Sequence, residues 1–180
     1  MPTTSAIEGF RAVVPAGGAG TRLWPVSRVG SPKFLHDLTG TGRTLLQGTV
    51  DRLAPLAGQG GVLVVTGAAH EAAVHAQLPD LGTAGVIAEP SPRDSMAAIG
   101  LAAAVLAERE GDVVIGSFAA DHVIEGAGFA EAVRQGVVAA RAGFVTTIGI
   151  AASEPSTAFG YIELGASLGL DKAPGARHVA

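Results

Sequence analysis

The sequence predicts an α/β protein with a mostly parallel central sheet, and three observations support this fold class. Short apolar runs alternate with segments of ten or more residues that carry apolar side chains at helical spacing, which is typical of βαβ units. Hydrophobic residues make up 48% of the 180 positions and aromatic residues only 4%, as expected for buried parallel strands covered by Ala-rich helices. The 26 glycines indicate many tight turns or close backbone approaches.

The expected elements follow one another along the chain. Strands are predicted at 10–15, 61–66, 84–88, 112–119, 144–150 and 159–164. Helices are predicted at 44–53, 68–78, 95–110 and 129–142, with Asp94 as the N-cap of the third. Residues 176–180 begin a further strand that nothing later in the sequence completes.

Composition limits the classes of partner. A length of 180 residues suits one domain with a buried core and is too short for two ordinary ones, so a single domain over 1–180 is predicted. The net charge of −4 without any basic run disfavours polymeric nucleic acid, although one phosphate site needs only a few cations and oriented amides. The absence of cysteine excludes disulfides and thiolate chemistry. With no leader-like or membrane-length segment, a soluble, cytoplasmic protein is expected.

The most informative segment is 16–25, AGGAGTRLWP, followed by Lys33 in PKFL. Three glycines directly after a strand allow successive N–H groups to point at an anion. Arg22 can hold two phosphate oxygens through its planar guanidinium, and Lys33 supplies a compact charge. The alternative is an ordinary surface turn with an incidental arginine. The spacing fits neither a P-loop nor a dinucleotide fingerprint, so hydride transfer is disfavoured.

A second polar segment, 89–95 (EPSPRDS), follows the third expected strand. Guanine presents two adjacent donors, N1–H and the N2 amino group, which one carboxylate can accept together, whereas adenine, uracil and thymine lack that pair. Glu89 is therefore the candidate reader of guanine, in a loop that Pro90 and Pro92 stiffen. The alternative is a solvated loop glutamate, as most glutamates are.

A candidate metal ligand, Asp121, follows the fourth expected strand in the segment FAADH. Ligands gather at the exits of central strands in an open α/β sheet. Hard carboxylate oxygens suit Mg²⁺, which would bridge the oxygens of a triphosphate. His122 has no second histidine at ligand spacing, and a hydrogen-bonding loop histidine is expected there instead.

Together these segments resemble the sugar-1-phosphate nucleotidyltransferases. GGAGTRLWPVSR with PKFL is similar to the family signature, and its Leu-Trp-Pro variant is similar to the mannose-1-phosphate guanylyltransferase branch. The Glu-Pro segment, Asp121-His122 and the run AFGYIE at 158–163 resemble further family motifs. This sequence departs from the family at Asp94, usually Asn, at Phe118-Ala119, usually Leu-Pro, and at 158–159, usually Gly-Tyr.

The resemblance implies a Rossmann-like three-layer nucleotide-diphospho-sugar transferase fold. It implies that GTP and mannose 1-phosphate are joined into GDP-mannose with release of pyrophosphate. The implied catalytic residues are Arg22, Lys33 and Asp121, with Mg²⁺ on Asp121. Nucleotide or sugar contacts are implied for Ala16, Gly17, Gly18, Gly20, Thr21, Glu89, Pro90, Arg93, Asp94, Ser95 and Gly160. For Gly160 the alternative is an ordinary strand start, with Tyr161 packed as core.

Two other functions remain open. One is a thymidylyl- or uridylyltransferase, for which Glu89 is an awkward base reader. The other is a non-catalytic, nucleotide-sugar-sensing regulatory subunit. The family's sugar-phosphate lysine and second metal-binding Asp are expected beyond Ala180. Residues 1–180 alone are therefore expected to turn over poorly, which favours the sensor. The presence of Arg22, Lys33 and Asp121 favours an enzyme. The sugar and the oligomeric state stay open, with a homodimer among the alternatives.

Overall fold

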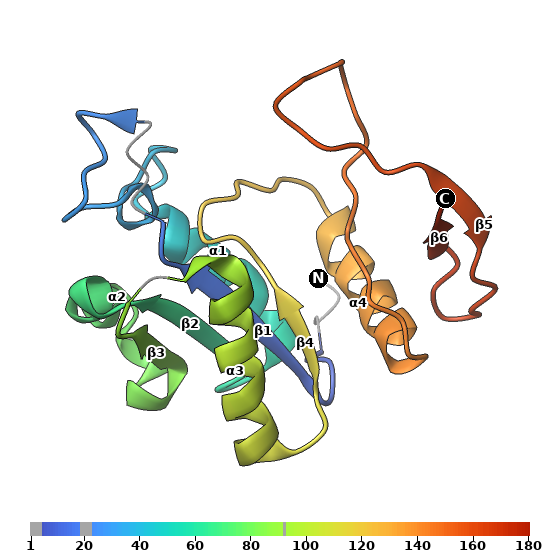
Figure 1. Cartoon of the computed structure of the whole chain (residues 1–180), viewed down its shortest axis with the longest axis horizontal. Helices are drawn as coiled ribbons and strands as arrows, with labels where there is room; N and C mark the ends of the chain where they lie inside the picture. The colour runs from blue at the N-terminus through green and yellow to red at the C-terminus, as the bar shows by residue number, and fades with distance from the viewer. Residues whose placement is uncertain (1–4, 19–22, 92) are drawn as a thin grey trace. The chain divides into compact units, whose positions relative to one another are not determined.

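The computed structural model describes residues 5–18, 23–91 and 93–180. The chain separates into two compact units, Met1–Ile124 and Glu125–Ala180. The first unit contains a parallel sheet with helices, and the second contains one long helix and a two-stranded sheet (Figure 1). Each unit is described by itself below, and the single domain expected from chain length stays a prediction.

The sheet of the first unit is built from four parallel strands in the order β3-β2-β1-β4. Their bounds are β1 Phe10–Ala16, β2 Val62–Gly67, β3 Val86–Glu89 and β4 Val114–Ser117. In the register, Val14 lies opposite Val64, and Val64 lies opposite Val86. Every residue of β2 is buried, as the continuous apolar run of a strand covered on both faces requires. The prediction of a mostly parallel central sheet is confirmed.

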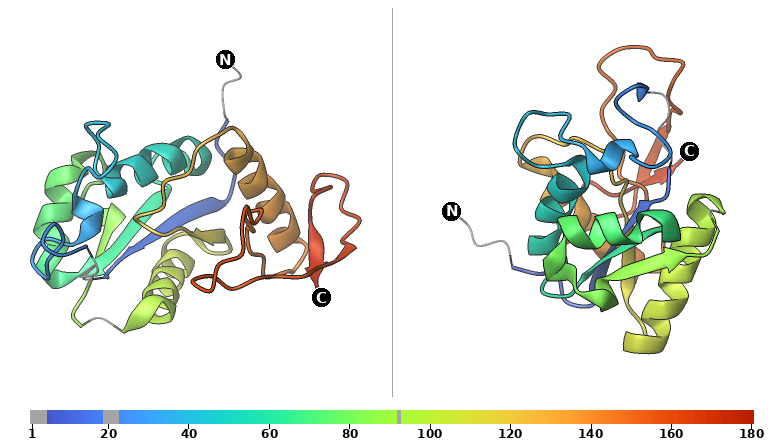
Figure 2. Two further views of the ribbon diagram at one scale, coloured as in Figure 1. Left: turned by 90° about the horizontal axis from the view of Figure 1, so that it is seen from above. Right: turned by 90° about the vertical axis from the view of Figure 1, so that its left-hand side faces the viewer.

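The side on which the chain adds its next strand changes at β1. The chain adds β2 and β3 on one side of β1 and then places β4 on the other side. Because parallel crossovers are right-handed, the helices of the first two crossovers cover one face and the helix of the third covers the opposite face. Figures 1 and 2 show the sheet lying between α3 and the pair α1 and α2. The reversal creates a switch point between β1 and β4 at their carboxyl ends, where open α/β sheets bind ligands.

On one face, α3 (Asp94–Glu110) packs closely against the sheet. Val13 and Val65 of the strands form a buried cluster with Ala98, Ala102 and Leu106 of the helix. The two alanines allow a close approach because their side chains end at Cβ. This packing anchors the first turn of α3 beside the carboxyl edge of the sheet.

On the other face, α1 (Leu45–Ala57) begins with a capping box. The Thr44 hydroxyl accepts a hydrogen bond from the Gln47 N–H, and the Gln47 side chain accepts one from the Thr44 N–H, which satisfies two otherwise unpaired backbone donors. The buried face of the helix includes Leu46, Leu53 and Leu56. The helix ends at Ala57, and its C-cap is Gly58, whose φ of 75° lies in the region that glycine favours.

Short helical turns complete the first unit. The expected helix 68–78 is divided into η3 (Ala68–His70) and α2 (Glu71–Gln77). Three further single turns are η2 (Lys33–Leu35), η4 (Pro79–Leu81) and η5 (Thr83–Gly85). η2 carries Lys33, one of the predicted site residues.

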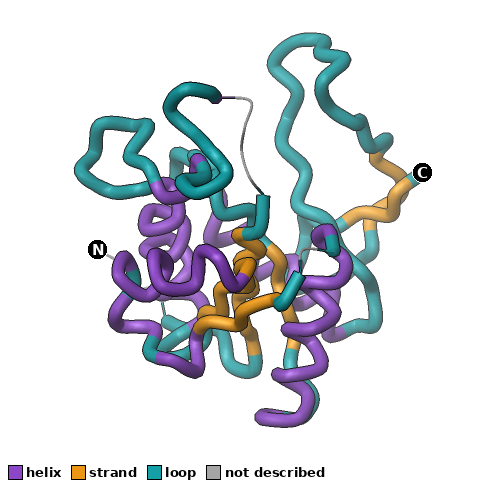
Figure 3. The backbone as a smooth tube through the Cα atoms, turned by 60° about the vertical axis from the view of Figure 1, so that its left-hand side comes forward, coloured by secondary structure: helices purple, strands orange, loops and turns teal. Residues whose placement is uncertain are grey.

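The second unit contains α4 (Gly128–Arg141) and the antiparallel strands β5 (Leu164–Ser167) and β6 (Arg177–Val179). Figure 3 shows long loop segments between α4 and this strand pair. The Gly175 N–H donates to Gln135 Oε1 at 2.8 Å, so α4 is tied to the loop that leads into β6.

Two strand predictions for the second unit are wrong in whole or in part. The described chain has no strand at 144–150, where Val145 and Ile150 are exposed. The strand expected at 159–164 begins only at Leu164. Residues 177–179 do form the strand that was expected to begin in 176–180, and it pairs with β5, which lies earlier in the chain. An apolar run supplies side chains for a sheet, yet a ladder also needs a neighbouring strand to satisfy its N–H and C=O groups.

The expected N-cap of α3 is also wrong. Asp94 is the first residue of the helix, with a φ of 63°, and Arg93 occupies the N-cap position without a side-chain cap hydrogen bond. Aspartate is one of the few residues that adopt this left-handed conformation readily, so the chain turns at Asp94 rather than before it. Within the described ranges, no helix combines the length and apolar character that crossing a bilayer requires.

Candidate functional site

Three predicted site residues lie at the carboxyl ends of strands in the first unit. Ala16 ends β1, Glu89 ends β3, and Asp121 lies four residues after the end of β4. Because the strands are parallel, their carboxyl ends share one edge of the sheet, and the switch point between β1 and β4 lies on that edge. The fold therefore places the glycine-rich loop and Asp121 after neighbouring strands.

The beginning of the glycine-rich loop is well defined. The carbonyl oxygen of Ala16 accepts a hydrogen bond of 2.8 Å from the buried Thr66 hydroxyl of β2, which fixes the point where the chain leaves the sheet. Gly17 and Gly18 follow and are exposed. Gly20, Thr21 and Arg22, to which phosphate contacts are assigned above, lie outside the described residues.

The structure brings together two predicted catalytic residues, Lys33 and Asp121, in an ion pair. Lys33 belongs to η2, whose last residue, Leu35, accepts a hydrogen bond of 3.0 Å from the Gln77 side chain. The Lys33 side chain is 33% exposed and that of Asp121 is 23% exposed. A pair with this much solvent access contributes little net stability. Its main consequence is to hold a cation and a carboxylate together at the switch point.

Glu89 is buried, with only 6% of its surface exposed. It lies opposite Gly67 at the end of β2, and the missing side chain of Gly67 leaves the edge open there. A Cβ built on Gly17 would lie 3.7 Å from Glu89 Oε2. The carboxylate therefore reaches across the end of β2 to the loop after β1. The alternative of a solvated loop glutamate is wrong.

The residues between Glu89 and α3 are accessible. Pro90, Arg93, Asp94 and Ser95 are all exposed and lead into the first turn of α3. They follow Glu89 closely in the sequence. Nucleotide contacts from them stay predictions.

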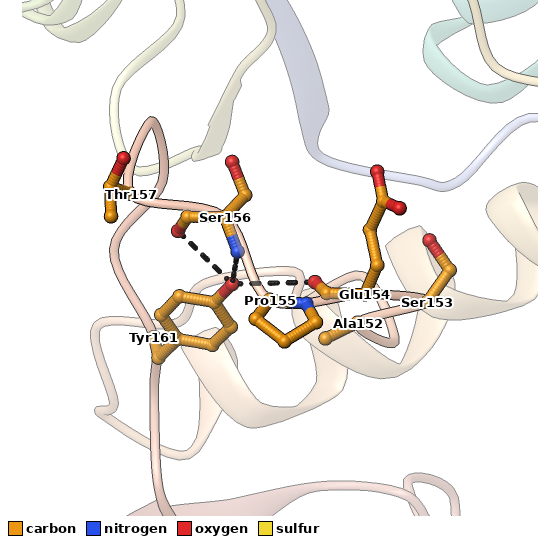
Figure 4. Close-up of a pocket in the computed structure, with 7 residues that line it drawn as sticks. All are labelled: Ala152, Ser153, Glu154, Pro155, Ser156, Thr157 and Tyr161. Carbon is orange, nitrogen blue, oxygen red and sulfur yellow. Dashed lines mark hydrogen bonds between the residues drawn. The ribbon is translucent and has the colours of Figure 1, made fainter.

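Gly160 belongs to the second unit and lies in an exposed loop. The next residue, Tyr161, is 61% exposed, so the alternative in which it packs as core is wrong. Its hydroxyl accepts a hydrogen bond of 2.7 Å from the Ser156 N–H and lies 3.1 Å from the Ser156 carbonyl oxygen. Figure 4 shows the phenol oxygen against the loop that passes through Glu154 and Ser156. This loop is therefore tied to the segment that carries Gly160.

Sequence reasoning missed two residues that hold the turn around Asp121. The Thr49 hydroxyl donates to the Ala120 carbonyl at 3.4 Å, and the Arg52 guanidinium donates to the His122 carbonyl at 3.1 Å. Burial lowers the pKa of Arg52 from its ordinary value. Thr49 lies between apolar positions on the buried face of α1, and a hydroxyl at such a position was the available signal.

The only predicted metal ligand here is the Asp121 carboxylate, so a metal at this place would take its other ligands from phosphate oxygens and water. Among the described residues, no group of three or more His, Asp or Glu side chains could form a metal cage. Mg²⁺ is usually held by one or two carboxylates together with substrate phosphates and water. Asp121 already faces a cation, the Lys33 ammonium. A single carboxylate is within that range, and Mg²⁺ on Asp121 stays a prediction.

The fold and this edge define an α/β protein of the Rossmann-like type, with a charged switch point beside a glycine-rich loop. The nucleotidyl transferase family model matches residues 11–173. This match spans most of the chain, and the chain belongs to the nucleotidyl transferase family.

Several relatives show the same similarity. The chain is 37% identical over 162 residues to the mannose-1-phosphate guanylyltransferase of Sinorhizobium fredii, covering 88% of this chain and 31% of the relative. It is 42% identical over 159 residues to the mannose-1-phosphate guanylyltransferase of Escherichia coli K12, covering 85% and 33%. The alginate biosynthesis protein AlgA of Pseudomonas aeruginosa is 38% identical over 157 residues, covering 86% and 32%.

A solved structure confirms the fold. The crystal structure of mannose-1-phosphate geranyltransferase from Thermus thermophilus superposes with a TM-score of 0.80 at 36% identity. The match covers 89% of this chain and 47% of that one. The chain thus spans about a third of the length of these relatives and about half of the solved structure.

Proposed function

We propose that the chain contributes the nucleotide site of a mannose-1-phosphate guanylyltransferase, which forms GDP-mannose and pyrophosphate from GTP and mannose 1-phosphate. The observation that carries this proposal is the pairing of Lys33 with Asp121 at the switch point. Family membership and the names of the relatives support the reaction class. The buried Glu89 carboxylate beside Gly17 supports the choice of guanine.

The proposed reaction is a direct displacement without a covalent enzyme intermediate. A phosphate oxygen of mannose 1-phosphate attacks the α-phosphorus of GTP, and the bond from that phosphorus to the bridging oxygen breaks. Pyrophosphate leaves with the electron pair of the broken bond. The work of the protein is to align the two phosphates and to neutralise charge.

Each charged residue has a separate task in this reaction. Lys33 would exchange Asp121 for a phosphate oxygen near the α-phosphorus when nucleotide binds. Arg22 would hold the oxygens of the leaving pyrophosphate through its planar guanidinium. Asp121 would hold Mg²⁺, which supplies charge neutralisation on the triphosphate oxygens when bound. Gly160 would approach the sugar through its backbone amide.

Base selection is assigned to Glu89. A carboxylate accepts the two adjacent donors of guanine, N1–H and the N2 amino group, and finds no such pair on adenine or on the pyrimidines. Burial strengthens this discrimination because a wrong base would leave the charged acceptor desolvated and unpaired. A protein that reads thymine or uracil would gain nothing from this carboxylate.

Calorimetric titration of the chain with GTP, ATP, UTP and dTTP, with and without Mg²⁺, tests the nucleotide assignment. GTP is expected to bind more tightly than the other three nucleotides, and to reach its full affinity only when Mg²⁺ is present. Pyrophosphate release with several sugar phosphates then tests the reaction. Lys33→Gln is expected to weaken Mg·GTP binding, whereas Lys172→Gln, an identical change at an exposed lysine, is expected to leave it unchanged.

The outcomes separate the alternatives. Preference for UTP or dTTP over GTP would replace the guanylyl assignment. Tight GTP or GDP-mannose binding without pyrophosphate release, with every sugar phosphate tried, would favour the non-catalytic nucleotide-sugar sensor. Equal effects of the two lysine substitutions would refute the role given to Lys33.

A further inference from the structure

The turn that carries Asp121 is held on both sides by α1. The Ala120 carbonyl, immediately before Asp121, accepts a hydrogen bond from Thr49 Oγ1 at 3.4 Å. The His122 carbonyl, immediately after it, accepts one from Arg52 Nη2 at 3.1 Å. Both bonds reach the backbone on either side of Asp121, while the Asp121 carboxylate faces Lys33.

The two donors act as one unit. Thr49 and Arg52 are three residues apart, which places them on the same face of the helix. Arg52 Nη2 also donates to the Thr49 hydroxyl oxygen at 3.2 Å. Thr49 has no exposed surface, and burial lowers the pKa of Arg52, so the guanidinium has given up part of its hydration at this place.

α1 is also held by contacts other than these two. The helix is fixed by its capping box and by buried leucines, among them Leu46, Leu53 and Leu56. What the two polar residues add is a fixed path for residues 120–122. In phosphoryl transfer the position of a charged ligand matters greatly, because a misplacement of about 1 Å can cost about 10²-fold in rate.

We propose that Thr49 and Arg52 are positioning residues that hold the Asp121 carboxylate in place by gripping the two carbonyls beside it. The proposal rests on the proposed function, since that function gives Asp121 the task of holding a metal on the triphosphate. Neither residue touches substrate; both act through the backbone of the turn.

The test uses the full chain with two matched pairs of variants. Arg52→Gln removes the donor to His122, and Arg43→Gln removes the same charge from an exposed ion pair of Arg43 with Asp51 near the same helix. Thr49→Val removes the hydroxyl at nearly constant shape, and Thr49→Ser keeps it. Two quantities are measured: amide hydrogen exchange in residues 118–124, and the dissociation constant of Mn²⁺·GTP by electron paramagnetic resonance.

Arg52→Gln and Thr49→Val are expected to speed exchange in 118–124 and to weaken Mn²⁺·GTP binding. Thr49→Val should change each by roughly 2- to 13-fold, the range that corresponds to one ordinary hydrogen bond, and Arg52→Gln, which removes a charged donor, by as much or more. Binding of metal-free GTP, exchange in α3, and both readouts in Arg43→Gln and Thr49→Ser are expected to stay at wild-type values. A merely structural role would shift metal-free and metal-bound GTP alike.

Unchanged exchange in both Arg52→Gln and Thr49→Val overturns the proposal, as does faster exchange without any loss of Mn²⁺·GTP affinity. If the wild-type chain binds no Mn²⁺·GTP, the proposed function fails. In that case the exchange measurement still decides whether the two side chains hold the turn.

Discussion

The two units differ in how they cover their apolar side chains. In the first unit, helices cover the sheet on both faces, and all of β2 is buried. In the second unit, Val145, Ile150 and Leu164 are exposed, although each lies in a run that was expected to form a strand. The difference teaches that an apolar run becomes core only where neighbouring strands and helices enclose it.

The largest expected effect tests this difference directly. Leu53→Ala in α1 removes a side chain with no exposed surface and is expected to lower the free energy of unfolding by about 2–5 kcal/mol. Ile150→Ala removes a side chain that is 84% exposed and is expected to change it by less than about 0.5 kcal/mol. Denaturant unfolding of both variants measures the two values.

Similar losses of unfolding free energy in the two variants would contradict the difference between the two units. They would mean that Ile150 is covered in solution, by a second copy of the chain or by another partner. Repeating the unfolding measurement over a range of protein concentrations distinguishes these cases, because only self-association makes the stability of the wild-type chain depend on its own concentration.

The sequence predicted the first unit better than the second, for a physical reason. Val13 and Val65 lie in short apolar runs bounded by glycine, and such runs are specified locally. That Lys33 and Asp121 lie together was also expected, because the family resemblance assigns both to one phosphate site. Sequence could not reveal that Thr49 and Arg52 grip the turn around Asp121, since that contact depends on how α1 packs.

The failed predictions have the same origin. The strand expected at 144–150 matched every local rule, but backbone pairing is a property of two segments and not of one. At Asp94, the residue type that often caps helices took a left-handed backbone conformation instead, because Asp is suited to both. Local patterns therefore predict elements well and their partners poorly.

The second expected effect concerns the charge that the first unit buries. Glu89→Gln keeps the size of the side chain but replaces one acceptor by an NH₂ group that would face the donors of guanine. The preference for GTP over ATP is expected to fall by about 10- to 150-fold, which corresponds to a charged hydrogen bond of about 1.5–3 kcal/mol. Competitive titration with the two nucleotides measures the ratio.

The matched control is Glu163→Gln, the same change at an exposed glutamate of the second unit, which is expected to leave the ratio unchanged. A Glu89→Gln variant that lost GTP and ATP affinity equally would show that Glu89 supports the loop rather than reading the base.

A third, smaller effect is expected in the second unit. Tyr161→Phe removes the hydroxyl that accepts from the Ser156 N–H and leaves the ring in place. Because the contact is solvent-exposed, the expected loss is at the low end of the usual hydrogen-bond range of about 0.5–1.5 kcal/mol. Hydrogen exchange at Ser156 is expected to become a few-fold faster while α4 is unaffected. Unchanged exchange at Ser156 would mean that the loop holds its shape without the tyrosine.

The smallest expected effect concerns a loop of the first unit. Like the loop held by Tyr161, it is held by one side chain, but here the side chain is a charged carboxylate. The Asp37 carboxylate accepts hydrogen bonds from the N–H groups of Thr39, Gly40 and Gly42, at 3.1, 2.8 and 2.7 Å. Desolvation raises its pKa, but these hydrogen bonds, with that from the Thr39 hydroxyl, outweigh it and lower the pKa below its ordinary 3.8.

Because the folded-state pKa is lowered, the carboxylate stabilises the loop above the unfolded-state pKa of about 3.9, and this contribution is lost as the pH falls through the folded value. Asp37→Asn is therefore expected to reduce the loss of stability on acidification below about pH 4, measured against Asp80→Asn as a control for removing one exposed charge. The Tyr161 contact in the second unit is made by a hydroxyl and not by a carboxylate. An Asp37 carboxyl that titrates at or above 3.8 by carbon NMR would contradict the assignment. The charge of Asp37 would then add nothing to the loop that it holds, and this loop would not differ in that respect from the loop held by Tyr161.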